Sequence, residues 1–180
     1  MKLWLVRHAR PLIEPGVCYG ATDVAADSSA TLEAAACLAS LLPVRAPVLC
    51  SPSQRCMQLA RNLQELRPGL RWQADARLTE MNFGCWEGWR WCDIPHKEFI
   101  PWIARFHDYR FGGCESTGEV MERVAQALSD SQPQQELIWI THAGVIRAAS
   151  LLTQGVSRVD EVRKWPRETV PFGTAYCVHC

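Results

Sequence analysis

Two arginines and two histidines stand out in this sequence because each lies at, or within a few residues of, the end of a short apolar run. Three runs are each followed by a polar group, and the pairs are Leu3–Val6 with Arg7-His8, Pro47–Cys50 with Ser51–Arg55, and Leu137–Ile140 with Thr141–Gly144. A guanidinium keeps its charge and pairs with two phosphate oxygens at once, whereas an imidazole titrates near neutral pH. If these groups converge, they suit a phosphate monoester, whose negative charge the arginines would offset.

The three apolar runs predict strands. Such short runs are too brief for helices, and without polar alternation they are typical of strands buried on both faces. Residues at helical spacing fill the intervals, at Thr31–Leu42, Ser53–Leu66 and Thr117–Leu128. Alternating strands and helices favour an α/β fold, a three-layer αβα sandwich with a mostly parallel central sheet. The carboxyl ends of parallel strands share one edge of a sheet, so the polar groups should meet there.

Weaker residue patterns predict the remaining elements. These are an edge strand at Leu70–Ala74, a helix at Pro95–Phe106 and a last strand at Thr169–Val178. Ser51-Pro52-Ser53 should open its helix, because serine caps helices and proline suits the first turn. We expect one domain over residues 1–180 with a lid-like insert at about 86–112. Four tryptophans there would either bind a ring of the substrate or form a structural cluster, and they are Trp86, Trp89, Trp91 and Trp102.

The charge balance narrows the range of partners. Lys plus Arg and Asp plus Glu each number 19, so the formal net charge is zero. Nucleic acids and anionic membranes favour basic surfaces, so we expect neither as a partner, and a small phosphorylated molecule suits the chain better. No apolar run approaches the length of a membrane span or a secretory signal, which favours a cytoplasmic protein. The oligomeric state is left open.

The nine cysteines are an odd number and are expected to be reduced, mostly buried thiols. The one close pair, in Cys177-Val178-His179-Cys180, could be half of a zinc site or a redox pair. No second pair has matching spacing, so a strand end that carries two thiols is the favoured interpretation. We therefore expect no metal or other cofactor.

The converging groups could carry out phosphoryl transfer. One neutral imidazole would attack phosphorus and form a phosphohistidine, while the other, if protonated, would hold the phosphate oxygens. The residues alone leave open which of His8 and His142 is the nucleophile. The leaving oxygen also needs a general acid. Glu80 is the main candidate, because its apolar neighbours would raise its pKa by desolvation, and Glu87 and Glu115 are the alternatives.

Five segments resemble, in order, the histidine phosphatase superfamily, the phosphoglycerate mutase-like group, and together they span most of the chain. They are Leu5–Ala9, Ser51–Arg55, Leu78–Glu80 with Phe83–Gly88, Gly112–Ser116 and Thr141–Arg147. The resemblance implies His8 as the phosphorylated nucleophile and Glu80 as the proton donor. It implies a phosphate pocket made by Arg7, Arg55 and His142, and hydrolysis that needs no metal ion.

Within this superfamily, the small size and the Trp86-Glu87-Gly88 loop are most similar to the α-ribazole phosphatases of cobalamin biosynthesis. Those enzymes remove the 5′-phosphate of α-ribazole phosphate or adenosylcobalamin phosphate. A phosphoglycerate mutase is less favoured, because mutases usually carry Asn where this chain has Glu14 and are usually longer. A broad-specificity histidine phosphatase and a non-catalytic module that binds a phosphorylated ligand stay open. Glu80 favours an enzyme, because a binding module needs no acid.

The chain departs from the superfamily pattern next to His8. Ala9 stands where glycine is usual, which would cost about 1 kcal/mol if this position needed a positive φ. Arg10-Pro11 replaces an acidic residue followed by a hydroxyl residue. We expect Arg10 to add positive charge at the mouth of the site, and count it with Gly20 and Glu115 among possible substrate contacts.

Overall fold

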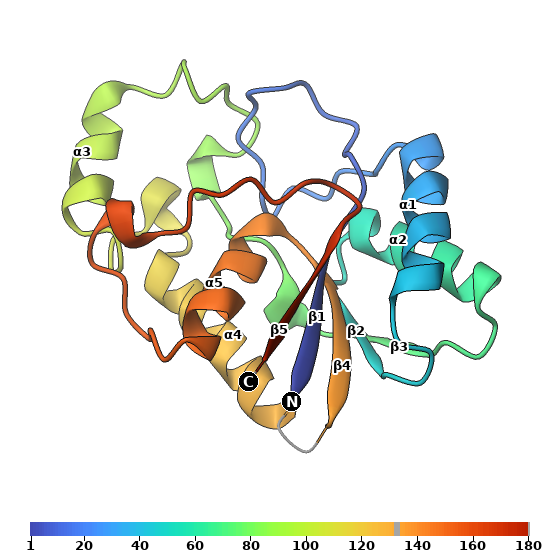
Figure 1. Ribbon diagram of the computed structural model, residues 1–180. Coiled ribbons are helices and arrows are strands. Elements are labelled where there is room, and N and C mark those ends of the chain that lie inside the picture. The colour runs from blue at the N-terminus through green and yellow to red at the C-terminus, as the bar shows by residue number, and fades with distance from the viewer. Residues whose placement is uncertain (132–133, 180) are drawn as a thin grey trace.

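The computed structural model describes residues 1–131 and 134–179, and the strands of this part of the chain form one sheet (Figure 1). The strands are β1 (Lys2–Arg7), β2 (Val48–Cys50), β3 (Trp72–Ala74), β4 (Glu136–Thr141) and β5 (Ala175–His179). Their order in the sheet is β3-β2-β4-β1-β5, and all neighbours are parallel except β1 and β5. The predicted α/β fold with a mostly parallel sheet is therefore confirmed.

Helices cover both faces of the sheet. They are α1 (Ser28–Leu41), α2 (Gln54–Leu66), α3 (His96–Ala104), α4 (Thr117–Ser131) and α5 (Ala143–Thr153). Figure 1 places α1 and α2 on one face and α4 and α5 on the other, whereas α3 lies away from the sheet. The arrangement gives the three layers expected from alternating strands and helices.

The central strands are apolar along their length because they bury side chains on both faces. In β4, Leu137 and Trp139 enter the core beneath α4 and α5, whereas Ile138 and Ile140 enter the core beneath α1 and α2. Full burial of an aliphatic side chain stabilises by about 1.5–3 kcal/mol. A strand between two helical layers therefore gains from apolar residues at every position and shows no polar alternation.

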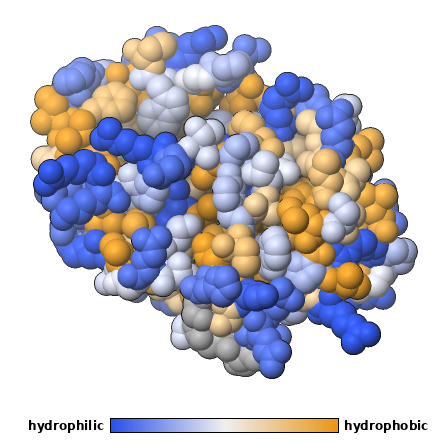
Figure 2. Space-filling view, viewed as in Figure 1, coloured by the Kyte–Doolittle hydropathy of each residue, from blue (hydrophilic) through white to orange (hydrophobic). Residues whose placement is uncertain are grey.

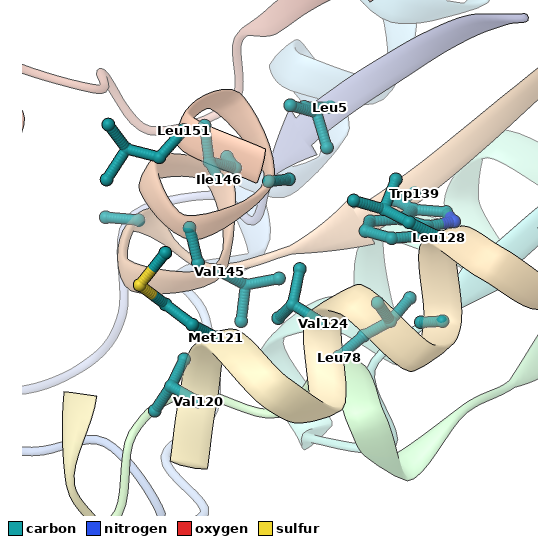
Figure 3. Packing of buried hydrophobic residues seen from close by; sticks show 14 of the residues in the cluster. Leu5, Leu78, Val120, Met121, Val124, Leu128, Trp139, Val145, Ile146 and Leu151 are labelled. Carbon is teal, nitrogen blue, oxygen red and sulfur yellow. The ribbon is translucent and has the colours of Figure 1, made fainter. Parts of the chain in front are cut away.

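The apolar stripe of α4 meets α5 and the sheet in a single cluster (Figure 3). The labelled members are Leu5, Leu78, Val120, Met121, Val124, Leu128, Trp139, Val145, Ile146 and Leu151. Trp139 is fully buried in this cluster and is the largest of its side chains. This packing fixes α5 on the sheet, and the residues at the start of α5 belong to the site described below.

The start of α2 differs from the sequence prediction. Ser53 is the N-cap residue, but its side chain makes no capping hydrogen bond. Instead, the Asp23 carboxylate accepts a hydrogen bond from the N–H of Gln54 at 2.7 Å. Ser53 therefore takes the predicted N-cap position, but an acidic residue from a distant loop accepts the hydrogen bond and also complements the helix dipole.

Two further local expectations can be compared with the structure. The last strand begins at Ala175 rather than Thr169, because Gly173, with a φ of 69°, turns the chain before it. Ala9 carries no strain, since every positive φ within the described residues belongs to a glycine. The replacement of the usual glycine after His8 therefore costs little here.

The segment from Gly84 to Gly113 has an aromatic core of its own. Phe111 is fully buried, and the Trp102 ring stacks on it with centroids 4.3 Å apart. Trp91 also stacks on Phe111, at 6.1 Å, and Trp86 contacts the same ring. Most of the tryptophans of the insert therefore form a structural cluster, while Trp89 is 48% exposed. Its function as a lid stays a prediction.

The surface is mixed in character. Hydrophobic and hydrophilic residues are interspersed over the face of the molecule shown in Figure 2. None of the helices in residues 1–131 and 134–179 is long and apolar enough to cross a membrane. With a formal net charge of zero, the chain lacks the strong basic balance that favours nucleic acids.

Candidate active site

The polar groups predicted at three strand ends meet at one edge of the sheet. β1, β4 and β2 are neighbours and run parallel, so their carboxyl ends lie together, at the upper edge in Figure 1. His8 follows β1 and His142 follows β4, and the centroids of their rings are 5.1 Å apart. Arg55, in the first turn of α2, brings its Nε to 3.3 Å from Nδ1 of His142.

His8 is held as a neutral imidazole with one free lone pair. Its Nδ1 lies 2.7 Å from the carbonyl oxygen of Ala9. A carbonyl only accepts, so Nδ1 carries the proton and Nε2 keeps its lone pair. Burial lowers the pKa of His8 to about 3, and the charges of Arg55 and Arg7 act in the same direction, against the hydrogen bond to Ala9. The ring is therefore uncharged near neutral pH.

Arg7 is positioned by the segment that precedes β5. Its guanidinium lies 3.7 Å from the centre of the Phe172 ring and donates to the carbonyl oxygen of Val170. Phe172 also lies against His8, with ring centroids 5.5 Å apart. Tyr19 is hydrogen-bonded to Arg7, and its ring lies 5.5 Å from the guanidinium of Arg55. Sequence reasoning missed Phe172 and Tyr19, because neither carries a charge or stands at a strand end.

Arg55 is fully buried and aimed by backbone carbonyls. Its Nη2 donates to the carbonyl oxygen of Gly20 at 2.7 Å, and its Nη1 donates to that of Thr22 at 2.9 Å. Gly20 must be glycine, because a Cβ there would lie 1.8 Å from the carbonyl oxygen of Met81. The structure thus places Gly20, a predicted possible substrate contact, behind Arg55 as part of its support.

Glu87 holds the loop that aims Arg55. Its carboxylate accepts hydrogen bonds from five donors, which are the backbone N–H groups of Gly20, Ala21, Thr22 and Phe83 and the Thr22 hydroxyl. Burial acts to raise the pKa of Glu87, but these hydrogen bonds outweigh it and lower the pKa below its ordinary value. Glu87 is therefore a charged clamp beneath the loop rather than a group free to exchange protons.

His142 is fixed by hydrogen bonds at both nitrogens. Its Nδ1 accepts from Nε of Arg55, so Nε2 carries the proton and donates to the Ser51 hydroxyl at 2.8 Å. Burial, with the positive charges of Arg55, Arg123 and Arg7, places the pKa of His142 well below its ordinary value. The protonated form that would hold phosphate oxygens is thus disfavoured by the protein itself, and a nearby phosphate dianion would act in the opposite direction.

The Glu80 side chain packs against the N-terminal end of α5. Its Oε2 accepts a hydrogen bond from the N–H of Gly144 at 3.0 Å, and its Oε1 accepts one from the N–H of Met81 at 3.0 Å. A Cβ on Gly144 would lie 2.2 Å from Oε1, so glycine is what lets the carboxyl group approach the helix. The contact ties Glu80 to the helix that directly follows His142.

The other candidate residues have different partners. Arg10 is exposed and pairs with Asp27 at 3.7 Å. Glu115 pairs with Arg123 at 2.7 Å and accepts a hydrogen bond from the N–H of Asn82. Of the three candidate acids, Glu115 is in an ion pair and Glu87 binds five donors, whereas Glu80 accepts only from the N–H groups of Met81 and Gly144.

The cysteines give no sign of a metal site. Within the described residues, no three His, Cys, Asp or Glu side chains are grouped to hold a metal ion. The expectation of mostly buried thiols is wrong, since Cys18, Cys50 and Cys56 are buried whereas Cys37, Cys85, Cys92, Cys114 and Cys177 are exposed. Cys180, the partner of Cys177 in the sequence motif, lies outside the described residues.

Two relatives of known description match most of this chain. A Hydrogenobacter thermophilus protein named as a candidate phosphoserine phosphatase is 26% identical over 162 residues, which cover 86% of this chain and 79% of that protein. An adenosylcobalamin/α-ribazole phosphatase from Escherichia coli is 27% identical over 154 residues, which cover 81% of this chain and 75% of that protein. Their names differ in substrate but agree on phosphate removal.

Solved structures and the family match agree with the architecture. The protein TTHB049 from Thermus thermophilus is 30% identical, with a TM-score of 0.73, and the match covers 99% of this chain and 93% of that chain. A mycobacterial glucosyl-3-phosphoglycerate phosphatase, 22% identical with a TM-score of 0.72 over 87% of this chain and 81% of its own, shares the fold. Residues 3–167 match the histidine phosphatase superfamily, branch 1. The chain therefore belongs to that superfamily and is a metal-independent phosphatase.

Proposed function

We propose that the chain hydrolyses phosphate monoesters of small molecules through a phosphohistidine formed on Nε2 of His8. The observation that carries this proposal is the hydrogen bond between Nδ1 of His8 and the Ala9 carbonyl oxygen, at 2.7 Å. This hydrogen bond fixes the proton on Nδ1, so the lone pair on Nε2 is available for attack on phosphorus. His142 lies beside this ring, and Arg7 and Arg55 supply the charged donors that phosphate oxygens need.

In the first half-reaction, the Nε2 lone pair of His8 forms a bond to phosphorus while the bond from phosphorus to the alcohol oxygen breaks. Glu80 donates its proton to that departing oxygen. The phosphorylated ring keeps its proton on Nδ1 and becomes positively charged, and the Ala9 carbonyl oxygen stabilises this charge through their hydrogen bond. Arg7 and Arg55 balance the charge on the phosphoryl oxygens.

In the second half-reaction, the Glu80 carboxylate takes a proton from water, whose oxygen forms a bond to phosphorus as the bond to Nε2 breaks. Inorganic phosphate leaves, and both His8 and Glu80 return to their starting forms. Because positioning and charge stabilisation dominate phosphoryl transfer, the buried supports of Arg55 matter as much as the reacting groups.

For the substrate, we propose the 5′-phosphate of α-ribazole or of adenosylcobalamin, which would place the protein in cobalamin biosynthesis. The likeness to the Escherichia coli adenosylcobalamin/α-ribazole phosphatase supports this choice, as does the Trp86-Glu87-Gly88 loop. A second candidate is phosphoserine, favoured by the Hydrogenobacter thermophilus relative and by Arg147, whose charge could pair with a carboxylate near Glu80.

Phosphate release from four esters tests the proposal, with EDTA present and His8→Ala as the comparison. The esters are α-ribazole 5′-phosphate, ribose 5-phosphate, phosphoserine and 3-phosphoglycerate. We expect fast release from α-ribazole phosphate, loss of release in His8→Ala, and an acid-labile phosphoenzyme in the wild type only. Release that persists in His8→Ala would refute the phosphohistidine. Ligand binding without any release would indicate a phosphate-binding module instead.

A further inference from the structure

Two cavities border Glu80, and they differ in chemistry. One, of about 460 Å³, is lined by Glu115, Glu119 and Arg123, whose charges are already engaged in ion pairs, together with small polar groups. The other, of about 260 Å³, is walled by apolar side chains. These two spaces are the candidates for the leaving group that Glu80 would protonate.

The smaller cavity has aromatic walls from segments far apart in the sequence. Phe83 precedes the insert, Trp102 lies on α3, Phe106 follows α3, and Trp165 comes from the segment after α5. The Phe106 ring contacts both tryptophans, at centroid distances of 5.7 Å to Trp102 and 5.9 Å to Trp165. Aromatic walls of this kind suit a planar ring, which they can contact by stacking or by edge-to-face packing.

Two side chains of this cavity carry buried hydrogen-bond donors without a partner. They are Nε1 of Trp102 and Nε of Arg147. Of the other two such atoms in the described chain, Nε of Arg7 belongs to the phosphate site and Nε1 of Trp139 lies in the core. A buried donor without a partner costs about 1–3 kcal/mol, so an acceptor on a ligand would relieve this cost.

We infer that this cavity is the leaving-group subsite and that it takes a planar, largely apolar ring carrying a neutral hydrogen-bond acceptor. The inference rests on the proposed function, because it needs Glu80 to act on the oxygen that joins the phosphate to that group. At about 260 Å³, the cavity is below the usual range of about 300–1,000 Å³ for ligand pockets. It therefore holds one ring system and leaves any larger attached group outside.

Arg147 does not change this choice. Its Nη2 donates to the carbonyl oxygen of Glu168 at 3.2 Å, so part of its donor capacity is already used. The other groups that line the cavity are mostly apolar, and Glu80 is itself acidic. A carboxylate in this space would lose water without full compensation. A neutral nitrogen or carbonyl acceptor loses less hydration on entering this space, and a shift of the Trp102 or Arg147 side chain would bring its buried donor to that acceptor.

The test compares α-ribazole 5′-phosphate with ribose 5-phosphate, which lacks only the ring base. We expect the wild type to have the higher kcat/KM with the ring-bearing ester. Trp102→Phe removes the indole N–H and keeps an aromatic wall, so it should lower the ratio of the two kcat/KM values about 3- to 10-fold. Trp72→Phe is the control, because Trp72 lies on the edge strand β3 with its Nε1 bonded to Gln64; it should leave the ratio unchanged.

Binding of free 5,6-dimethylbenzimidazole, measured by calorimetry, tests the subsite without catalysis. We expect binding in the wild type, weaker binding in Trp102→Phe, and none in Val162→Trp, which fills the cavity from a half-buried turn. The second variant covers the case in which loss of the Trp102 stacking unfolds the insert. Benzimidazole binding that is equally tight in the wild type and in both variants would overturn the inference.

Failure of the inference and failure of the proposed function give different results. If both esters turn over equally through His8 and the benzimidazole does not bind, the subsite is refuted while the phosphatase stands. If the benzimidazole binds with the expected dependence on Trp102 but no ester forms a phosphoenzyme, the proposed reaction fails and the subsite stands. Preference for phosphoserine over phosphoethanolamine that is lost in Arg147→Met would show a carboxylate site and overturn the inference.

Discussion

Substitution of Gly144 by alanine should lower activity while leaving the fold intact. Gly144 is the second residue of α5 and has no positive φ, so alanine fits its backbone. The obstacle is Glu80, because the new Cβ would lie 2.2 Å from Oε1 and 3.1 Å from Cδ. Since non-bonded carbon contacts settle near about 3.5 Å, the carboxyl group must move by about 1 Å. It is the end of a flexible side chain and can do so.

The two consequences of this shift have opposite signs. Alanine is favoured over glycine in a helix by up to about 1 kcal/mol, which offsets the weakened hydrogen bond between the Gly144 N–H and Glu80. We therefore expect the free energy of unfolding to change by less than about 1 kcal/mol. A displacement of about 1 Å at a reacting group can cost about 100-fold, so kcat/KM for an alkyl phosphate should fall by that factor.

The assay uses urea denaturation for stability and two substrates for catalysis. Ribose 5-phosphate has a poor leaving group that needs the acid, whereas p-nitrophenolate departs without a proton. Gly144→Ala should therefore resemble Glu80→Gln, with slow release from ribose 5-phosphate and a burst of p-nitrophenolate followed by slow turnover. Gly69→Ala is the matched control, because a Cβ at Gly69 meets nothing within 4 Å. Wild-type kcat/KM for ribose 5-phosphate in Gly144→Ala would refute the role of Glu80.

Two further predictions concern the supports of the site. Glu87→Gln removes the charge that binds five donors, so we expect a loss of about 2–4 kcal/mol in the free energy of unfolding and vanadate inhibition weakened about 10-fold or more. Leu128→Ala is a core control of similar cost to stability and should keep the wild-type inhibition constant for vanadate. An unchanged inhibition constant in Glu87→Gln would count against the role of Glu87 in holding the loop. The pKa of His8 lies near 3, below its unfolded value, so the unfolded chain binds more protons below about pH 6.5. The free energy of unfolding should therefore fall as pH drops from about 6.5, by up to about 1.4 kcal/mol per pH unit. His8→Asn should flatten this slope in urea denaturation, and an equally steep slope in the variant would contradict the lowered pKa of His8.

The convergence of the two histidines and Arg55 could be predicted because strand ends obey a simple rule. An apolar run of few residues identifies a buried strand, and parallel strands gather their carboxyl ends at one edge. His8 and His142 each stand two residues after the end of such a run, and Arg55 follows another after one turn, so their convergence could be predicted without any distance. The order of the strands, with β4 between β1 and β2, is what places both histidines side by side.

The supports of these groups could not be predicted, because they depend on where loops return. Glu87 looked like a possible acid from its sequence, but its role is set by donors that come mostly from a loop more than sixty residues earlier. Phe172 stands in a stretch that reads as a strand, yet it packs on Arg7 and His8. Asp23 caps α2 from outside that helix. Nothing in local spacing encodes such contacts.

These supports explain why the proposed phosphate pocket can be rigid although it is built from three strand ends. Arg55 contacts His142 directly and donates hydrogen bonds to the carbonyl oxygens of Gly20 and Thr22. The backbone N–H groups of Gly20 and Thr22 in turn donate to the Glu87 carboxylate. Each link is a hydrogen bond to a charged group, which is stronger than one between neutral groups. A guanidinium with fixed donors meets a phosphate without reorganising, which is the condition for electrostatic stabilisation of phosphoryl transfer. A change at Glu87 should therefore reach the phosphate through Arg55, without contact between the two carboxylate oxygens and the substrate.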